Sequence, residues 1–173
     1  SATSIDGNGL FTLAGAHTGA IDNGSGADGS GTVTLGATFG VTGIVGGTNS
    51  LLAITSDSTG GTTAFGAAVS ATTITLGGTG ATTAAGDLTG AVNMSATSGT
   101  PSLTVGADIK VVGGITFTTT NINKVDFVAT TTNTTIVSAG IGADGKIAKE
   151  IEIESTAGGT VVVTVGGDIW TTL

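Results

Sequence analysis

The stretch TVTLGATFGV at residues 32–41 decides the fold, because apolar residues alternate with small or polar residues along its whole length. Strict alternation is typical of a β-strand that buries one of its two faces. Gly36 lies near the middle, where a glycine can break the strand at a corner. The apolar residues occupy the odd-numbered positions: Val33, Leu35, Ala37, Phe39 and Val41.

The same pattern returns as SLTVGADIKV at residues 102–111, where Gly106 takes the place of Gly36. Likewise, HTGAIDN at residues 17–23 is answered by LTGAVNM at residues 88–94. Self-similarity at a fixed period, here about 71 residues, predicts a duplicated structural unit. We expect a single β-repeat domain over residues 1–173, with a polar arm (1–8), a first repeat (8–78) and a second repeat followed by a partial third (79–173).

Strands that alternate with turns every 8 to 12 residues or so are compatible with two all-β architectures. One is a parallel β-solenoid (β-helix), in which a duplicated unit of about 71 residues holds about three coils. The other is an antiparallel Greek-key β-sandwich with strand exchange. Glycines at regular corners, threonine ladders and small interior alanines favour the solenoid. The long alternation at residues 32–41 favours the sandwich.

Composition excludes several kinds of partner. The formal net charge is −8, and the four basic residues are all lysines, so the basic stripe that nucleic-acid binding needs is missing. With no cysteine, disulfides and thiolate zinc sites are excluded. No apolar run approaches the roughly 18 residues of a membrane helix, so we expect no membrane insertion. We expect a secreted or cell-surface protein from which a leader has been removed.

Two neighbouring segments near the C-terminus bear on whether a strand edge of this protein can pair with another chain. The segment TVVVTV at residues 160–165 has high β-propensity and no charge, and such a strand recruits another chain when its edge is exposed. The segment KEIEIE at residues 149–154 places Glu150, Glu152 and Glu154 on one face of a strand. This face either deters pairing or forms a row that binds cations. We expect the partners to be copies of the chain itself, joined through exposed β-edges.

Several phrases resemble a known family. HTGAIDN with TVTLG, LTGAVNM with LTVGADI, INKVDF, and KEIEIE followed by GTVVVTVGGDIW are similar to passenger repeats of rickettsial outer-membrane protein B type autotransporters. The resemblance covers residues 8–173 and implies secretion, a surface-coat or adhesin role, and no catalysis. The translocator barrel of that family has no counterpart in this sequence. Bacterial and archaeal surface-layer and filament subunits share the same composition.

Few residues are candidates for a binding or modification site. Asp22, Asn23 and Asp28 lie in a glycine-rich loop that is either a plain turn or a weak calcium site, since calcium takes carboxylate and carbonyl oxygens. The spacing departs from that of an EF-hand loop, and a closing glutamate is missing. Three sequons make Asn23, Asn93 and Asn133 candidates for glycosylation in a competent host.

The sequence carries no recognisable catalytic motif. His17 is the only histidine and has no paired acid at a suitable spacing, and neither a P-loop nor a GxSxG elbow is present. We therefore predict a non-catalytic extracellular structural protein without a cofactor, a self-associating subunit of a prokaryotic surface coat or filament. The alternative is an adhesin passenger segment of a larger autotransporter-like surface protein, which binds a host or neighbouring cell surface.

Overall fold

The structure is a computed structural model that describes residues 2–24, 26–36, 38–129 and 132–171. These residues form strands and turns, and no helix is found among them. The strands are β1 (Thr3–Ser4), β2 (Leu10–Leu13), β3 (Ile21–Asp22), β4 (Ser30–Leu35), β5 (Gly40–Val41), β6 (Leu51–Asp57), β7 (Thr62–Phe65), β8 (Val69–Gly77), β9 (Ala81–Ala84), β10 (Leu88–Met94), β11 (Ser102–Val105), β12 (Lys110–Val112), β13 (Ile115–Phe117), β14 (Lys124–Ala129), β15 (Asn133–Val137), β16 (Glu150–Ser155) and β17 (Val161–Val165).

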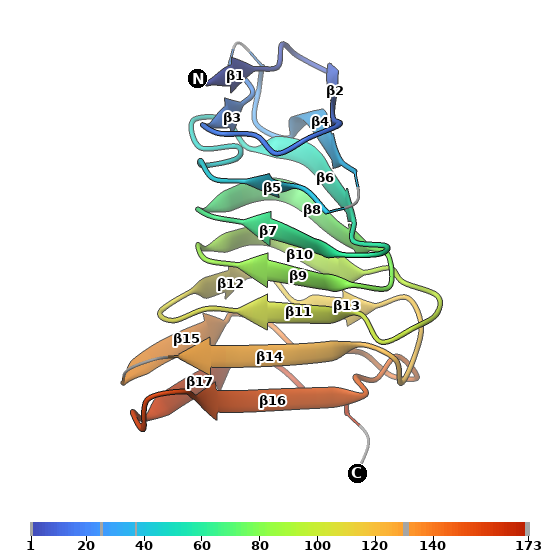
Figure 1. Ribbon diagram of the computed structural model, residues 1–173, viewed down its shortest axis with the longest axis vertical. Helices are drawn as coiled ribbons and strands as arrows, with labels where there is room; N and C mark the ends of the chain where they lie inside the picture. The colour runs from blue at the N-terminus through green and yellow to red at the C-terminus, as the bar shows by residue number, and fades with distance from the viewer. Residues whose placement is uncertain (1, 25, 37, 130–131, 172–173) are drawn as a thin grey trace.

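The chain winds into a parallel β-solenoid of about seven turns, with the N-terminus at the narrow end and the C-terminus at the broad end (Figure 1). One sheet has the order β16-β14-β11-β9-β7-β5, and a larger one has the order β17-β15-β12-β10-β8-β6-β4-β2, with β13 also paired to β10. Strands β1 and β3 form a small third sheet, which is parallel like the other two. Strands in the two large sheets pair in parallel with the strands of the turns before and after. The predicted solenoid is therefore confirmed, and the sandwich is excluded.

Three columns of inward-facing residues run along the solenoid, one on each face. The first column contains Phe11, Val33, Ile54, Ile74, Val92, Ile115, Ile141 and Ile169. The second contains His17, Val41, Phe65, Ala84, Val105, Phe127 and Ile153. The third contains Ile21, Val45, Val69, Leu88, Val111, Val137 and Val165. Apart from the end members of the first two columns and Val165, all of these residues are buried, so the columns form much of the hydrophobic core, which also holds neighbouring residues such as Leu35, Leu103 and Val125.

Glycines allow the corners of successive turns to stack closely. Gly90 lies where β10 bends from the third face to the first, with φ at +132°. A Cβ atom at Gly90 would collide with the carbonyl oxygen of Ala71 in the turn above. Gly43 packs in the same way against the backbone of Gly19. Any larger residue at either corner would push neighbouring turns apart.

The two similar stretches share one local structure, a strand followed by a corner and a second strand. Their strands are β4 and β5 in the first copy and β11 and β12 in the second. Thr38 and Asp108 occupy equivalent corner positions with φ of 65° and 56°, so the chain turns where Gly36 and Gly106 predicted a corner. Ala107 is exposed, which ends the alternation at the corner, and Ala37 lies outside the described residues.

The offset between the two stretches is not a whole number of turns. Val33 belongs to the first face, whereas Leu103, its counterpart, lies on the second face and pairs with Thr82 and Val125. The length of a turn also varies, because the turn from Val69 to Leu88 is much shorter than the turn from Val137 to Val165. The two copies of the repeat therefore share the same strand-and-corner structure, but they lie on different faces of the solenoid and do not stack on each other.

The N-terminal segment differs from the polar arm expected for residues 1–8. Strand β1 pairs in parallel with β3, through Thr3 with Ile21 and Ser4 with Asp22. Ile5 is buried in the core. One apolar residue in a polar segment is too weak a signal for sequence reasoning, but this residue anchors the segment as part of the first turn.

Candidate functional site

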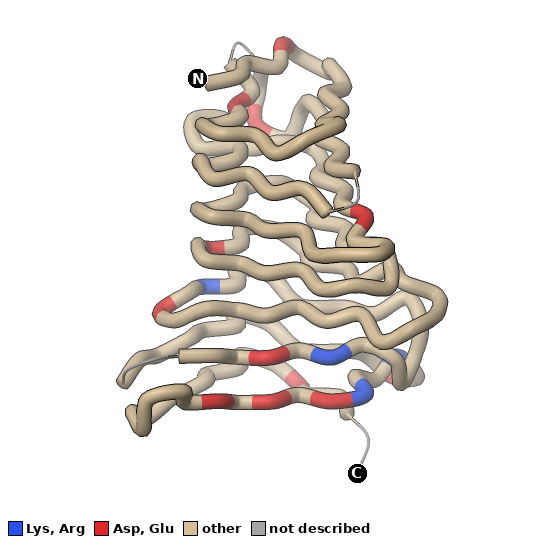
Figure 2. The backbone as a smooth tube through the Cα atoms, viewed as in Figure 1, with Lys and Arg blue, Asp and Glu red and all other residues tan. Residues whose placement is uncertain are grey.

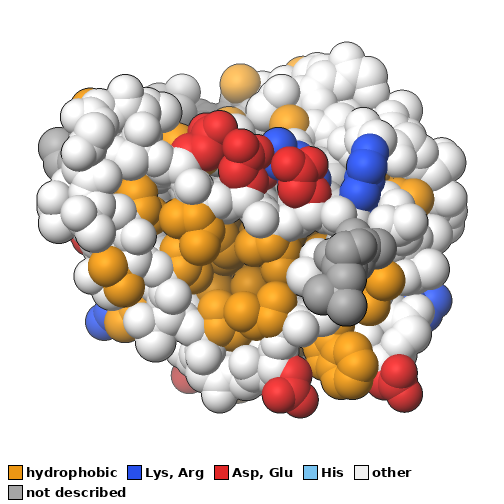
Figure 3. All heavy atoms as spheres, turned by 90° about the horizontal axis from the view of Figure 1, so that it is seen from below, with side chains coloured by type: hydrophobic (Ala, Val, Ile, Leu, Met, Phe, Trp, Pro, Cys, Tyr) orange, Lys and Arg blue, Asp and Glu red, His pale blue; other side chains and the backbone are white. Residues whose placement is uncertain are grey.

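The last turn of the solenoid exposes its interior in the described part of the chain. Strand β16 pairs with β14 on one side, and β17 pairs with β15 on one side. No described strand pairs with their other edges. Seen along the axis from this end, a hydrophobic floor lies inside a rim of polar and acidic side chains (Figure 3). We call this surface, formed by β16, β17 and Ile169, the open end.

Exposure along the columns changes abruptly at the open end. Phe127 has no exposed surface, whereas Ile153, the next member of its column, is 54% exposed. Ile141 is 1% exposed, and Ile169 below it is 52% exposed. The inward positions of the last turn are apolar: Ile151, Ile153, Val161, Val163, Val165 and Ile169. These side chains resemble an interior layer without the turn that would cover it.

The backbone at the open end is ready to pair. Thr160 O accepts a hydrogen bond from Asn133 N at 3.0 Å, and Gly166 N donates to Val137 O at 2.8 Å. Because successive residues of a parallel strand bond to opposite neighbours, the N–H and C=O groups of Val161, Val163 and Val165 point to the free edge. By the same alternation, the backbone N–H and C=O groups of Ile151 and Ile153 point to the free edge of β16.

The outer face of β16 carries the predicted row of Glu150, Glu152 and Glu154. Lys124 on β14 donates a hydrogen bond to Glu152 and lies 3.3 Å from an oxygen of Asp126 and 3.8 Å from one of Glu150. All four lysines lie in the later turns, and Lys124 is the one that pairs with these acids (Figure 2). One ammonium group thus faces several carboxylates, and the rim of the open end stays acidic.

The carboxylates of this row influence one another's ionisation. The hydrogen bond from Lys124 lowers the pKa of Glu152. A hydrogen bond with Glu152, together with repulsion between their charges, raises the pKa of Glu154. The hydrogen bond to Glu152 also raises the pKa of Lys124, so this lysine stays charged. Glu154 is therefore the member of the pair that takes up a proton first as the pH falls.

The predicted calcium residues serve as a brace between turns. The carboxylate of Asp22 accepts hydrogen bonds from the backbone N–H groups of Thr48 at 3.1 Å and Asn49 at 3.1 Å. The carboxylate of Asp28 accepts a hydrogen bond from the backbone N–H of Ser50 at 2.8 Å. Asn23 is buried and directs its amide NH₂ into its own loop. Among the described residues, no group of three or more His, Cys, Asp or Glu side chains is placed to hold a metal ion.

Removing the brace should destabilise the fold in a pH-dependent way. Burial favours a higher pKa for Asp22, but hydrogen bonds from Thr48, Asn49 and Asn23 outweigh it and bring the pKa below its ordinary value of 3.8. The stabilisation is therefore present above that value and is lost as the pH falls through the pKa of the folded state. We expect Asp22→Ala to lower the free energy of unfolding by about 1–2 kcal/mol at neutral pH. Denaturant unfolding of the wild type and of Asp22→Ala, at neutral pH and near pH 2.5, measures this difference in stability and its loss on acidification. Equal free energies of unfolding for the two proteins at neutral pH would contradict the role of Asp22.

Two of the three candidate glycosylation residues are inaccessible. Asn23 has no exposed surface, and Asn133, the first residue of β15, is 5% exposed. A glycan on either side chain is incompatible with this fold. Asn93 lies half-buried on β10, where its Oδ1 accepts a hydrogen bond from Thr118 at 3.4 Å. Ser25, which completes the sequon of Asn23, lies outside the described residues.

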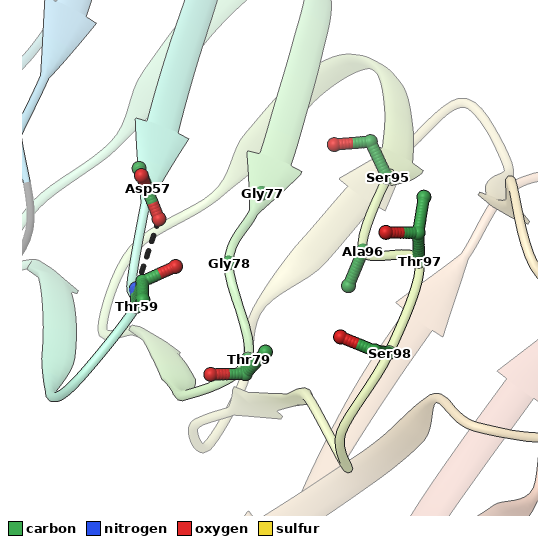
Figure 4. Close-up of a pocket in the computed structure, with 9 residues that line it drawn as sticks. All are labelled: Asp57, Thr59, Gly77, Gly78, Thr79, Ser95, Ala96, Thr97 and Ser98. Atoms are coloured by element: carbon green, nitrogen blue, oxygen red, sulfur yellow. Dashed lines mark hydrogen bonds between the residues drawn. The ribbon is translucent and has the colours of Figure 1, made fainter.

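A small groove lies where three corner loops stack (Figure 4). It has a volume of about 260 Å³, and its floor is open because Gly77 and Gly78 bring no side chains. Asp57 accepts a hydrogen bond from Thr59 N at 2.9 Å, and hydrogen bonds with Thr59 lower the pKa of Asp57. The groove offers one carboxylate and several hydroxyl groups. Its lining consists of Asp57, Thr59, Gly77, Gly78, Thr79, Ser95, Ala96, Thr97 and Ser98.

Sequence reasoning missed the groove and part of the open end. The groove had a signal in the Gly-Gly-Thr triplet at residues 77–79, all three of which line it. Ile169 had none, because it belongs to no alternating apolar stretch.

Comparisons with family models, with curated proteins and with solved structures found no match for this chain. No described helix is long and apolar enough to span a membrane.

Proposed function

We propose that this chain is a non-catalytic structural subunit that associates with copies of itself through the open end and builds an extracellular coat or filament. The observation that carries the proposal is the last turn, whose inward apolar side chains and strand edges have no cover in the described residues. Contiguous exposed apolar surface rimmed by polar residues is typical of interaction sites.

The open end combines two sources of affinity. Covering Ile153, Ile169 and the half-exposed valines of β17 removes apolar surface from water, which favours association. Pairing the free edges of β16 and β17 adds main-chain hydrogen bonds, as in β-strand addition. A surrounding acidic surface with net charge −8 keeps the subunit soluble before it assembles.

Sedimentation equilibrium over a wide range of protein concentrations tests the proposal. We expect the average mass to rise with concentration, and electron microscopy of concentrated material to show ordered fibres or sheets. The wild-type chain remaining a monomer at high concentration would overturn the proposal.

Association should also depend on pH, because the acidic rim lies beside the joint. Interaction with Glu152 raises the pKa of Glu154 above its ordinary value of 4.5. Glu154 therefore loses its charge early as the pH falls, and this loss weakens the repulsion between the acidic rims of two approaching subunits. We expect association to strengthen a few-fold on acidification, and Glu154→Gln to flatten this dependence. A profile that is the same for the variant and the wild type would contradict this role of Glu154.

The same open end favours one alternative, an adhesin segment of a larger surface protein in which a further coil covers the last turn. The longer chain would then stay monomeric at concentrations at which residues 1–173 alone associate. Sedimentation of the two chains side by side separates the alternatives.

A further inference from the structure

We propose that two copies join open end to open end about a two-fold axis, with β16 of one copy pairing antiparallel to β17 of the other. This inference rests on the proposed function and specifies the partner and the geometry of the joint. A two-fold joint uses the same surface on both subunits, the commonest arrangement in homo-oligomers, and it closes on itself, so its product is a dimer that serves as the building unit of the coat or filament.

The taper of the solenoid favours like ends. The turn at the C-terminal end runs from Val137 to Val165, whereas the turn at the N-terminal end runs only from Thr3 to Ile21 and is much shorter. The narrow N-terminal end of a second copy would leave part of the broad open end uncovered (Figure 1). A second open end matches it in size and covers one apolar floor with another.

The acidic row then selects which strands meet. Pairing β16 with β16 of the partner subunit would set two rows of Glu150, Glu152 and Glu154 against each other, and like charges directly opposite are destabilising. Pairing β16 with β17 of the partner subunit places these glutamates opposite Gly166, Thr164 and Val162, which carry no charge.

The register follows from the corner at residues 156–160, which separates β16 from β17. A two-fold axis through this corner exchanges the two strands, so residues equally far from the corner face each other. Ile153 then lies opposite Val163 of the partner subunit, and Glu152 lies opposite Thr164 of the partner subunit. Inward positions meet inward positions along both strands, so no charged side chain is buried in the joint.

Cysteine cross-linking tests this pairing, and the chain has no cysteine of its own. Opposed Cβ atoms in an antiparallel pair lie about 4.5–5.5 Å apart, close to the distance that a disulfide requires. We expect a mixture of Glu152→Cys and Thr164→Cys chains, one carrying a mass tag, to form a mixed covalent dimer on oxidation. Glu154→Cys with Val162→Cys is a second pair in the same register, and each variant alone should form little cross-linked product.

The outcomes separate this inference from the proposed function. A dimer of Glu152→Cys with itself, in place of the mixed dimer, would indicate β16 against β16 and overturn the inference. Variants that associate under reducing conditions without cross-linking in either mixture would overturn it too, with the proposed function intact. Variants and wild type that never associate would overturn both.

Discussion

Replacing Val163 with lysine is expected to weaken self-association of the chain by at least about tenfold, which corresponds to about 1.4 kcal/mol. Val163 points inward at the middle of β17 and packs against the hydrophobic core. A lysine there would reach solvent in the free subunit but would carry its charge into an apolar contact on association. Inward-pointing charges are among the devices by which natural sheets prevent edge pairing.

Val112→Lys is the matched control, because Val112 is an exposed, outward-pointing valine on β12, two turns away from the open end. Sedimentation equilibrium of both variants, with thermal unfolding to verify that each is folded, measures the effect. Equal association of the two variants would show that the inner face of β17 is not part of the joint.

Phe127→Ala should cause the largest loss of stability of the changes considered. Phe127 has no exposed surface and lies in the second column between Val105 and Ile153. Deleting its ring removes buried apolar surface and leaves a cavity that rigid stacked strands cannot close. We expect the free energy of unfolding to fall by about 3–5 kcal/mol.

The neighbouring outward residue provides the control. Val128 lies on the same strand with its side chain half-buried on the outer face, so Val128→Ala should cost less than about 1.5 kcal/mol. Urea unfolding monitored by circular dichroism compares the two variants. Similar losses for both would mean that the columns are not the core of the fold.

Much of the fold could be predicted from local alternation. The odd residues Val33 and Leu35, and later Leu103 and Val105, are buried as the sequence indicates, because a strand with one apolar face has one stable orientation. Corners at Gly36 and Gly106 were predictable from the glycines, which can break a strand, although the apolar alternation of the sequence continues past them.

The stacking of the turns could not be predicted. Val33 and Leu103 lie on different faces because turn length varies, and the sequence does not show how many residues each corner takes. Parallel pairing joins residues that are a whole turn apart in the chain, so it leaves no local signal. The fixed offset between the two stretches therefore identified similar segments without identifying which segments lie above one another.

The candidate site was predictable in part. Residues 149–154 and 160–165 predicted strands with an acidic face and an uncharged edge, and both lie at the open end. The role of Lys124 was hidden, because only the parallel pairing of β14 with β16 brings it to Glu152. Asp22 and Asp28 suggested a cation site because a carboxylate that accepts backbone N–H groups has the same sequence signature as a metal ligand.

Amide hydrogen exchange at the open end tests the central claim most directly. The N–H groups of Val161, Val163 and Val165 point to the free edge of β17, whereas those of Val162 and Thr164 already face β15. The account predicts that exchange at the first three slows by at least about tenfold between dilute and concentrated protein, as the edge becomes paired. Fast exchange at these three residues, independent of protein concentration, would contradict it.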